Sequence, residues 1–210
     1  MRFLVLISAV GLLAQEQSAP SASATRGMPA RATPADYQAH AEAGPVTVGA
    51  EFFQHSVPTP QGMLITEDYV VVEAGLFGPQ TKISFEDFSL RINGRKNPQP
   101  SEPYALVFKS LKDPEWEPPF PVEEKHSKSS INTGGGKGGG SDPPPVVHPP
   151  IKTQREWEQR AQKAAFPEGD RALPQAGLLF FRYGGKASGI HSIELIYSGP
   201  TGKATLVLQP

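Results

Sequence analysis

The chain has 210 residues and a formal net charge of −1, because 20 Lys and Arg residues nearly balance 21 Asp and Glu residues. This balance excludes the large basic excess of a dedicated nucleic-acid binder. The sequence contains no cysteine, which excludes disulfides, thiolate catalysis and cysteine-based metal centres. With 21 Gly and 23 Pro residues, the composition favours short strands and turns over a helical bundle.

Residues 1–24 are typical of a secretory signal peptide. Met1-Arg2 supplies a positive charge, and the charge-free apolar run Phe3–Ala14 follows it. This run is shorter than the roughly 20 apolar residues of a membrane-spanning helix. Several small residues between positions 14 and 24 suit cleavage. We therefore expect a secreted or periplasmic protein with no stable membrane span.

Two segments are poor in large apolar residues and rich in chain breakers. Residues 25–45 contain Ala, Ser, Pro and Thr in excess, which predicts a flexible leader. Residues 114–150 contain a glycine tract followed by Pro143-Pro144-Pro145, which predicts a disordered insert. The glycine tract does not match a phosphate-binding loop, because prolines stand where that loop would lead into a helix.

Seven segments show the alternation or the β-branched enrichment typical of strands. In the first, Val46, Val48, Ala50 and Phe52 fall on one face. In the third, the apolar positions change parity near Asp87, which predicts a β-bulge or a bend between sheets. The seven expected strands are Val46–Phe52, Ile65–Gly75, Thr81–Asn93, Tyr104–Leu111, Gly177–Tyr183, Ile190–Tyr197 and Lys203–Leu208.

One helix is expected, over Thr153–Phe166. Trp157 and three alanines recur there at helical spacing, with charged residues on the opposite side. The apolar run Leu178–Phe181 predicts a strand covered on both faces. These elements favour an all-β fold, an immunoglobulin-like antiparallel β-sandwich of about seven strands with one short helix. We expect residues 46–210 to form one domain interrupted by the insert, because neither half has enough strands for a core of its own.

The block Leu173–Leu208 resembles the closing hairpin of small secreted bacterial Ig-like sandwich domains, including a family of unknown function and the telokin-like group. Gly177–Phe181, Ile193–Tyr197 and Gly202 occupy the apolar strand, the Leu-x-Tyr strand and the turn of that pattern. The resemblance implies a sandwich fold and an envelope location, and it implies no catalytic residues.

No local pattern predicts a catalytic residue, a cofactor or a preformed metal site. The histidines show no metal-ligand spacing, and strand geometry places His191 and Glu194 on opposite faces. The acidic pairs beginning at Glu67 and Glu86 flank strands, and we interpret them as solubilising strand ends. Paired carboxylates of distant elements also serve hydrolases, which keeps an envelope-acting hydrolase as an alternative. The five histidines are His40, His55, His126, His148 and His191.

Trp116 and Trp157 each lie between two glutamates. Exposed tryptophans mark glycan-stacking sites or partner hot spots, whereas covered ones shield a sandwich edge. From these features we expect a secreted, non-catalytic binding or structural module of the cell envelope, with an envelope protein or glycan as partner. Contact is expected through Trp116 and Trp157 or the insert beside them. A periplasmic metal carrier is the remaining alternative.

Overall fold

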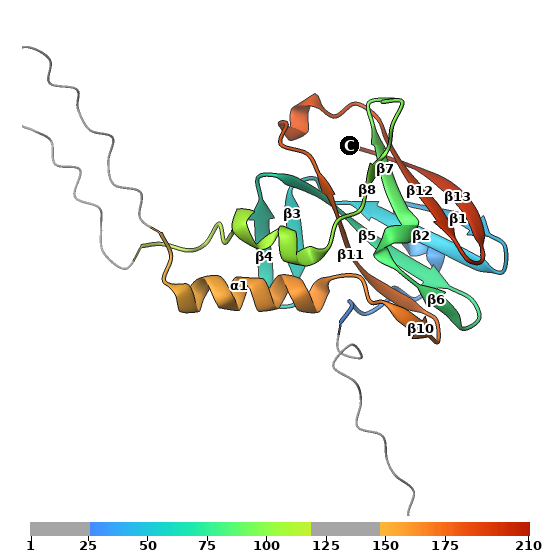
Figure 1. The fold of residues 1–210 in the computed structure, drawn as a ribbon, viewed down its shortest axis with the longest axis horizontal. Coiled ribbons are helices and arrows are strands. Elements are labelled where there is room, and N and C mark those ends of the chain that lie inside the picture. The colour runs from blue at the N-terminus through green and yellow to red at the C-terminus, as the bar shows by residue number, and fades with distance from the viewer. Residues whose placement is uncertain (1–25, 119–147) are drawn as a thin grey trace, which may run out of the picture.

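The computed structural model describes residues 26–118 and 148–210 (Figure 1). Within them, strands β1–β13 form four antiparallel sheets, accompanied by one α-helix and short 3-10 turns. This arrangement confirms the all-β class. The immunoglobulin-like strand order stays a prediction.

Two four-stranded sheets pack against each other. The first has the order β1 (Ala39–Ala43), β2 (Val46–Phe52), β5 (Tyr69–Phe77), β11 (Gln175–Arg182). The second has the order β13 (Gly202–Leu208), β12 (Ile193–Gly199), β7 (Phe88–Ile92), β8 (Gln99–Pro100). Every second side chain along these strands points into the space between the two sheets and helps to fill it, because successive side chains of a strand point to opposite faces.

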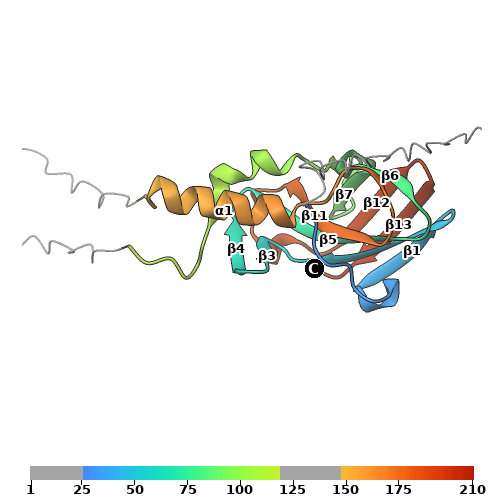
Figure 2. The same ribbon diagram turned by 90° about the horizontal axis from the view of Figure 1, so that it is seen from below.

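Strands β5 and β11 are buried on both faces. Val70 and Leu179 belong to the core between the two sheets, whereas Val71 and Leu178 belong to a second core on the opposite face. The fully apolar run Leu178–Phe181 therefore reflects a strand covered on both sides, as its sequence indicates. The molecule consequently has three layers, with the β1-β2-β5-β11 sheet in the middle (Figure 2).

The third layer contains α1 (Ile151–Ala164) and a small sheet in the order β3 (Ser56–Thr59), β4 (Gly62–Thr66), β9 (Leu111–Lys112). The helix buries Trp157, Ala161 and Ala164, which confirms the face indicated by their spacing. Ala165 and Phe166 leave the helix instead of continuing it, and Phe166 N donates to Leu178 O at 2.9 Å. Pro167 explains this end, because proline disfavours a helical residue before it.

The parity change near Asp87 marks a bend between sheets, as predicted. β6 (Thr81–Ile83) pairs with β10 (Gly169–Arg171), whereas β7 pairs with β12. The 3-10 turn η3 (Phe85–Asp87) separates β6 from β7, and Ser84 caps it by accepting from Glu86 N.

Two predictions are wrong. The strand expected over Tyr104–Leu111 is replaced by the 3-10 turns η4 (Tyr104–Leu106) and η5 (Phe108–Ser110), followed by β9. Here i to i+3 hydrogen bonds, such as Ser110 N to Val107 O at 3.0 Å, hold the backbone locally instead of in a ladder.

The leader predicted for residues 25–45 is also corrected. It contains the 3-10 turn η2 (Pro34–Asp36) and β1, which pairs with β2 along its whole length. Small alanines fit against β2, and Ala43 is buried in the core. The segment thus gains its order from the sheet beneath it and not from large apolar residues of its own.

Several expectations concern residues outside the described ranges. These are the signal peptide at residues 1–24, most of the insert (residues 119–147) and His126. In the part of the chain that the structure describes, no helix combines the length and apolar character needed to cross a membrane.

Candidate binding cleft

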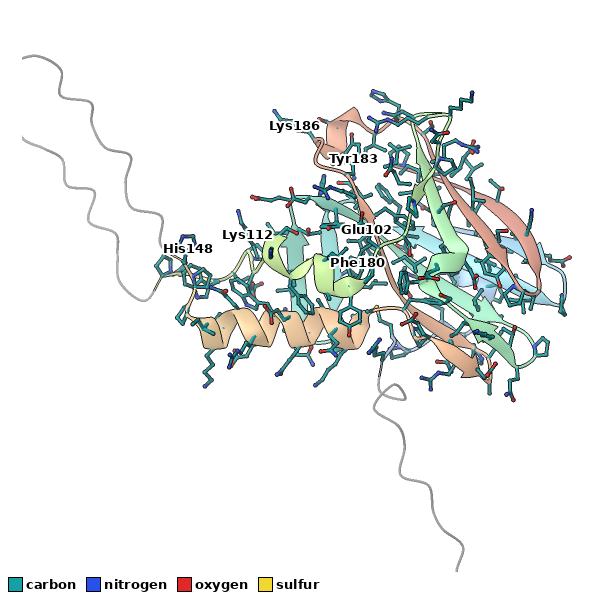
Figure 3. The ribbon with its side chains drawn as sticks, in the orientation of Figure 1. Glu102, Lys112, His148, Phe180, Tyr183 and Lys186 are labelled. Atoms are coloured by element: carbon teal, nitrogen blue, oxygen red, sulfur yellow. The ribbon has the colours of Figure 1, made fainter. Side chains whose placement is uncertain are left out.

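A cleft of about 510 Å³ lies between the first turns of α1 and the segment that follows η5. Its size falls within the usual range of ligand pockets. Figure 3 labels Lys112 and His148 at this end of the molecule. The lining residues are Phe108, Lys109, Leu111, Lys112, Asp113, Trp116, His148, Pro149, Gln154, Trp157 and Glu158.

One wall of the cleft is α1. Pro150 occupies the N-cap position with non-helical backbone, and the helix begins at the next residue, Ile151. Gln154 Nε2 donates to Pro149 O at 2.7 Å, which ties the chain before the helix to its first turn. Trp157 lies one turn further on, on the buried side of α1. The helix therefore presents Gln154 and Trp157 together, at i and i+3.

The opposite wall is the segment from β9 to Trp116. Asp113 folds it into a turn: its Oδ1 accepts from Glu115 N at 3.0 Å, and its backbone O accepts from Trp116 N at 3.1 Å. Arg160 Nη1 lies 2.9 Å from Asp113 Oδ2, and both side chains are 17% exposed. This largely buried ion pair fixes the turn to α1 and holds Trp116 over the helix.

The two tryptophans meet inside the cleft. Their ring centroids are 6.3 Å apart and their planes are inclined by 82°, an edge-to-face pair. Trp157 is 6% exposed and belongs to the second core, whereas Trp116 is only partly buried. Each of the two roles considered from the sequence, covering the core and contacting a partner, therefore fits one of the two tryptophans. Trp157 covers the core, and Trp116 is the ring that a ligand can reach.

The polar groups around the cleft carry both signs of charge. Lys109 and Lys112 lie on one side, and Glu158 lies on α1. Several of these groups already have structural partners: Lys112 Nζ lies 2.5 Å from Glu67 Oε1, and Asp113 is paired with Arg160. What remains for recognition is an aromatic and aliphatic floor with a rim of mixed charge.

The other residues singled out in the sequence lie elsewhere or have different roles. His55 links the first residue of β5 to the loop after β11, because its ring nitrogens lie 2.7 Å from Tyr69 O and 2.9 Å from Gly185 O. Glu67 pairs with Lys112 at the surface, and Glu86 lies in η3. Glu194 pairs with Arg91 on the neighbouring strand. No group of three or more potential metal ligands occurs within residues 26–118 and 148–210.

Sequence reasoning missed most of the cleft. His148 falls within the predicted insert, yet it lines the cleft together with Pro149. The Asp113–Arg160 pair was also missed, because it joins residues 47 positions apart that have no pattern in common. Only the repeated Glu-Trp-Glu pattern pointed to this region, and it identified both tryptophans.

No protein-family model, no curated protein sequence and no solved structure matches this chain. The resemblance of Leu173–Leu208 to secreted Ig-like sandwich domains therefore stays a prediction, and the geometry of the cleft carries the functional argument.

Proposed function

We propose that the protein is a secreted, non-catalytic binding module of the cell envelope, and that its partner occupies the Trp116–Trp157 cleft. The observation that carries this proposal is the aromatic cleft itself, in which Trp116 is held partly exposed against the buried Trp157. Partner hot spots are enriched in tryptophan, and they concentrate in packed pockets with a polar rim. The secretory character of residues 1–24 supports the envelope location.

The partner that fits best is an extended peptide segment of an envelope protein. Trp116 is held edge-to-face against the buried Trp157, with an interplanar angle of 82°, and its partly exposed ring offers a surface on which a proline ring or an apolar side chain packs. Lys109 and Lys112 lie on one side of the cleft and Glu158 on the other, and a rim with both signs of charge suits the donors and acceptors of a peptide backbone.

A photo-crosslinking amino acid placed at position 109 in intact cells tests this proposal. Lys109 lines the cleft, and the matched control position is the exposed Lys203 on β13. Figures 1 and 2 show β13 at the other end of the molecule from the first turn of α1. We expect an adduct from position 109, none from position 203, and loss of the adduct in Trp116→Ala.

The chemistry of the adduct decides between partner classes. Peptides foreign to this chain in the mass spectrum of the digested adduct support a protein partner, whereas an added mass that a glycosidase removes supports the glycan alternative. Equal adducts from positions 109 and 203, or an adduct that persists in Trp116→Ala, would contradict the proposed site.

A further inference from the structure

Two loops lie side by side at one end of the two packed sheets (Figure 1). The first, residues 93–98, joins β7 to β8, and the second, residues 183–192, joins β11 to β12. The side chain of Asn93 ties them together: its Nδ2 donates to Gly189 O at 2.7 Å, and its Oδ1 accepts from His191 N at 2.7 Å. The first loop is therefore fixed against the second.

The second loop is also fixed on its other side. His55 Nε2 lies 2.9 Å from Gly185 O, and Tyr183 N donates to Asp68 O at 2.8 Å. Lys186 therefore lies between this attachment and the one made by the first loop. A glycine-rich loop at the surface usually loses conformational entropy when it binds a ligand, and these attachments reduce that loss in advance.

The two loops concentrate positive charge. The first contains Arg95 and Lys96, the second contains Lys186 and His191, and neither contains Asp or Glu. All four residues, here called the basic patch, are exposed. In the whole chain, by contrast, acidic residues outnumber Lys and Arg by 21 to 20. The basic patch is thus a local feature and does not reflect a basic composition.

The charges of the basic patch are not neutralised within residues 26–118 and 148–210. None of its Lys and Arg side chains has an ion pair or a hydrogen bond there, whereas Arg31, Arg91 and Arg160 all pair with carboxylates. The amide N–H groups of residues 184–188 likewise have no acceptor in the described ranges. Unpaired cations beside unpaired backbone donors are the groups that hold anions in proteins.

We propose that the basic patch binds a ligand that carries two or more phosphate groups, either a soluble polyphosphate or the phosphates of an anionic lipid surface. A guanidinium binds phosphate with two parallel hydrogen bonds, and an ammonium attracts it as a point charge. Several phosphates in one ligand can engage both loops at once, which strengthens binding. Figure 3 labels Lys186 on the second loop and Lys112 and His148 at the cleft. The two sites share no residue, so the inference goes beyond the proposed function.

Inorganic tripolyphosphate, titrated into the full chain by isothermal calorimetry, tests the proposal. One variant removes the three Lys and Arg charges of the basic patch, and a matched control removes three exposed charges of α1. We expect the affinity to fall at least about tenfold in the first and to change little in the control. Equal losses in both, or no binding by wild type, overturn the proposal. The patch variant carries Arg95→Gln, Lys96→Gln and Lys186→Gln, and the control carries Lys152→Gln, Arg155→Gln and Lys163→Gln.

Asn93→Gly tests whether the two loops act as one site. Asn93 has a φ of 53°, which glycine adopts without strain, and the substitution removes the side chain that ties the loops without changing any charge. We expect a cooperative thermal transition and tripolyphosphate binding weaker by about threefold or more, because the loops are no longer held together. Unchanged affinity overturns the two-loop site.

Vesicles distinguish the two sources of phosphate. Wild type and both triple variants are sedimented with phosphatidylcholine vesicles that contain or lack phosphatidylglycerol. Co-sedimentation with the anionic vesicles only, lost in the patch variant and kept in the α1 control, supports the proposal with lipid phosphates as the ligand. Tripolyphosphate binding without co-sedimentation supports it with a soluble ligand. Co-sedimentation that the patch variant retains places the phosphate contact elsewhere and overturns the proposal.

Discussion

Replacing Arg31 with alanine removes the cation that bridges Glu51 and Glu73. The Glu73 side chain is 5% exposed, that of Arg31 is 28% exposed and that of Glu51 is 30% exposed. Removing one partner of a buried ion pair costs roughly 3–5 kcal/mol, whereas an exposed pair contributes roughly 0–1 kcal/mol. Because one carboxylate is buried and the other groups are partly exposed, we expect the free energy of unfolding to fall by about 3 kcal/mol.

Urea denaturation of wild type and Arg31→Ala at neutral pH measures this loss. The matched variant is Arg31→Ala combined with Glu73→Gln, which removes the unpaired buried charge and keeps the shape of the side chain. We expect this second substitution to restore about 1–2 kcal/mol of the loss. A loss below about 0.5 kcal/mol, or no recovery with Glu73→Gln, would refute the electrostatic reasoning.

Three further predictions concern Tyr37, its contact with Gly75, and the two tryptophans of the cleft. Gly75→Ala is expected to lower the free energy of unfolding by about 1–3 kcal/mol in wild type and by much less in a Tyr37→Ala background, because the new Cβ collides with the Tyr37 ring. A double-mutant cycle measured by urea denaturation tests this, and additive losses would show that the collision is not the cause. Burial raises the pKa of Tyr37 to about 12, against about 10 in the unfolded chain. The folded state therefore holds the Tyr37 proton more tightly than the unfolded state, and the free energy of unfolding falls by about 2 kcal/mol as the pH rises from 10 to 12. Urea denaturation at several pH values in this range should show the loss in wild type but not in Tyr37→Phe. Trp157→Ala should lower the free energy of unfolding by about 3–5 kcal/mol and Trp116→Ala by about 1 kcal/mol, since only the first ring is buried in the core; equal losses in thermal or urea denaturation would contradict the division of roles.

Patterns within one element predicted the larger part of the fold. The strands around Val48, Val71, Leu179 and Leu206 carry apolar side chains that the sheets bury, and their period or composition indicates strands directly. The helix around Trp157 was recognised for the same reason, since its buried face follows the helical period.

The errors arose where order depends on a neighbour distant in sequence. Residues 39–43 are small and polar, and only pairing with β2 makes them a strand. Residues 104–111 are apolar enough for a strand, but local hydrogen bonds fold them into 3-10 turns. A short hairpin, β3 with β4, was missed because its apolar positions are too few for a period to emerge.

The candidate cleft was likewise predictable only in part, because local patterns pointed to it but contacts between distant residues build it. The Glu-Trp-Glu repeats drew attention to Trp116 and Trp157, but their contact depends on the Asp113–Arg160 pair and on the turn at Asp113. The contact of Arg31 and Tyr37 with the middle sheet depends on the cross-strand pairing of Gly49 with Gly75 and of Glu51 with Glu73, which only the register of β2 and β5 reveals.

Tryptophan fluorescence tests the central claim most directly, because both tryptophans of the chain line the cleft. Tryptophan emission therefore reports on this site alone. The titrant is a synthetic peptide that copies the partner segment crosslinked at position 109. We predict a saturable shift of the emission in wild type, a shift of similar affinity in the control Lys203→Ala, and none in Trp116→Ala. Peptide binding that leaves the emission unchanged, or an equal shift in Trp116→Ala, would contradict the assignment of the partner site to the cleft.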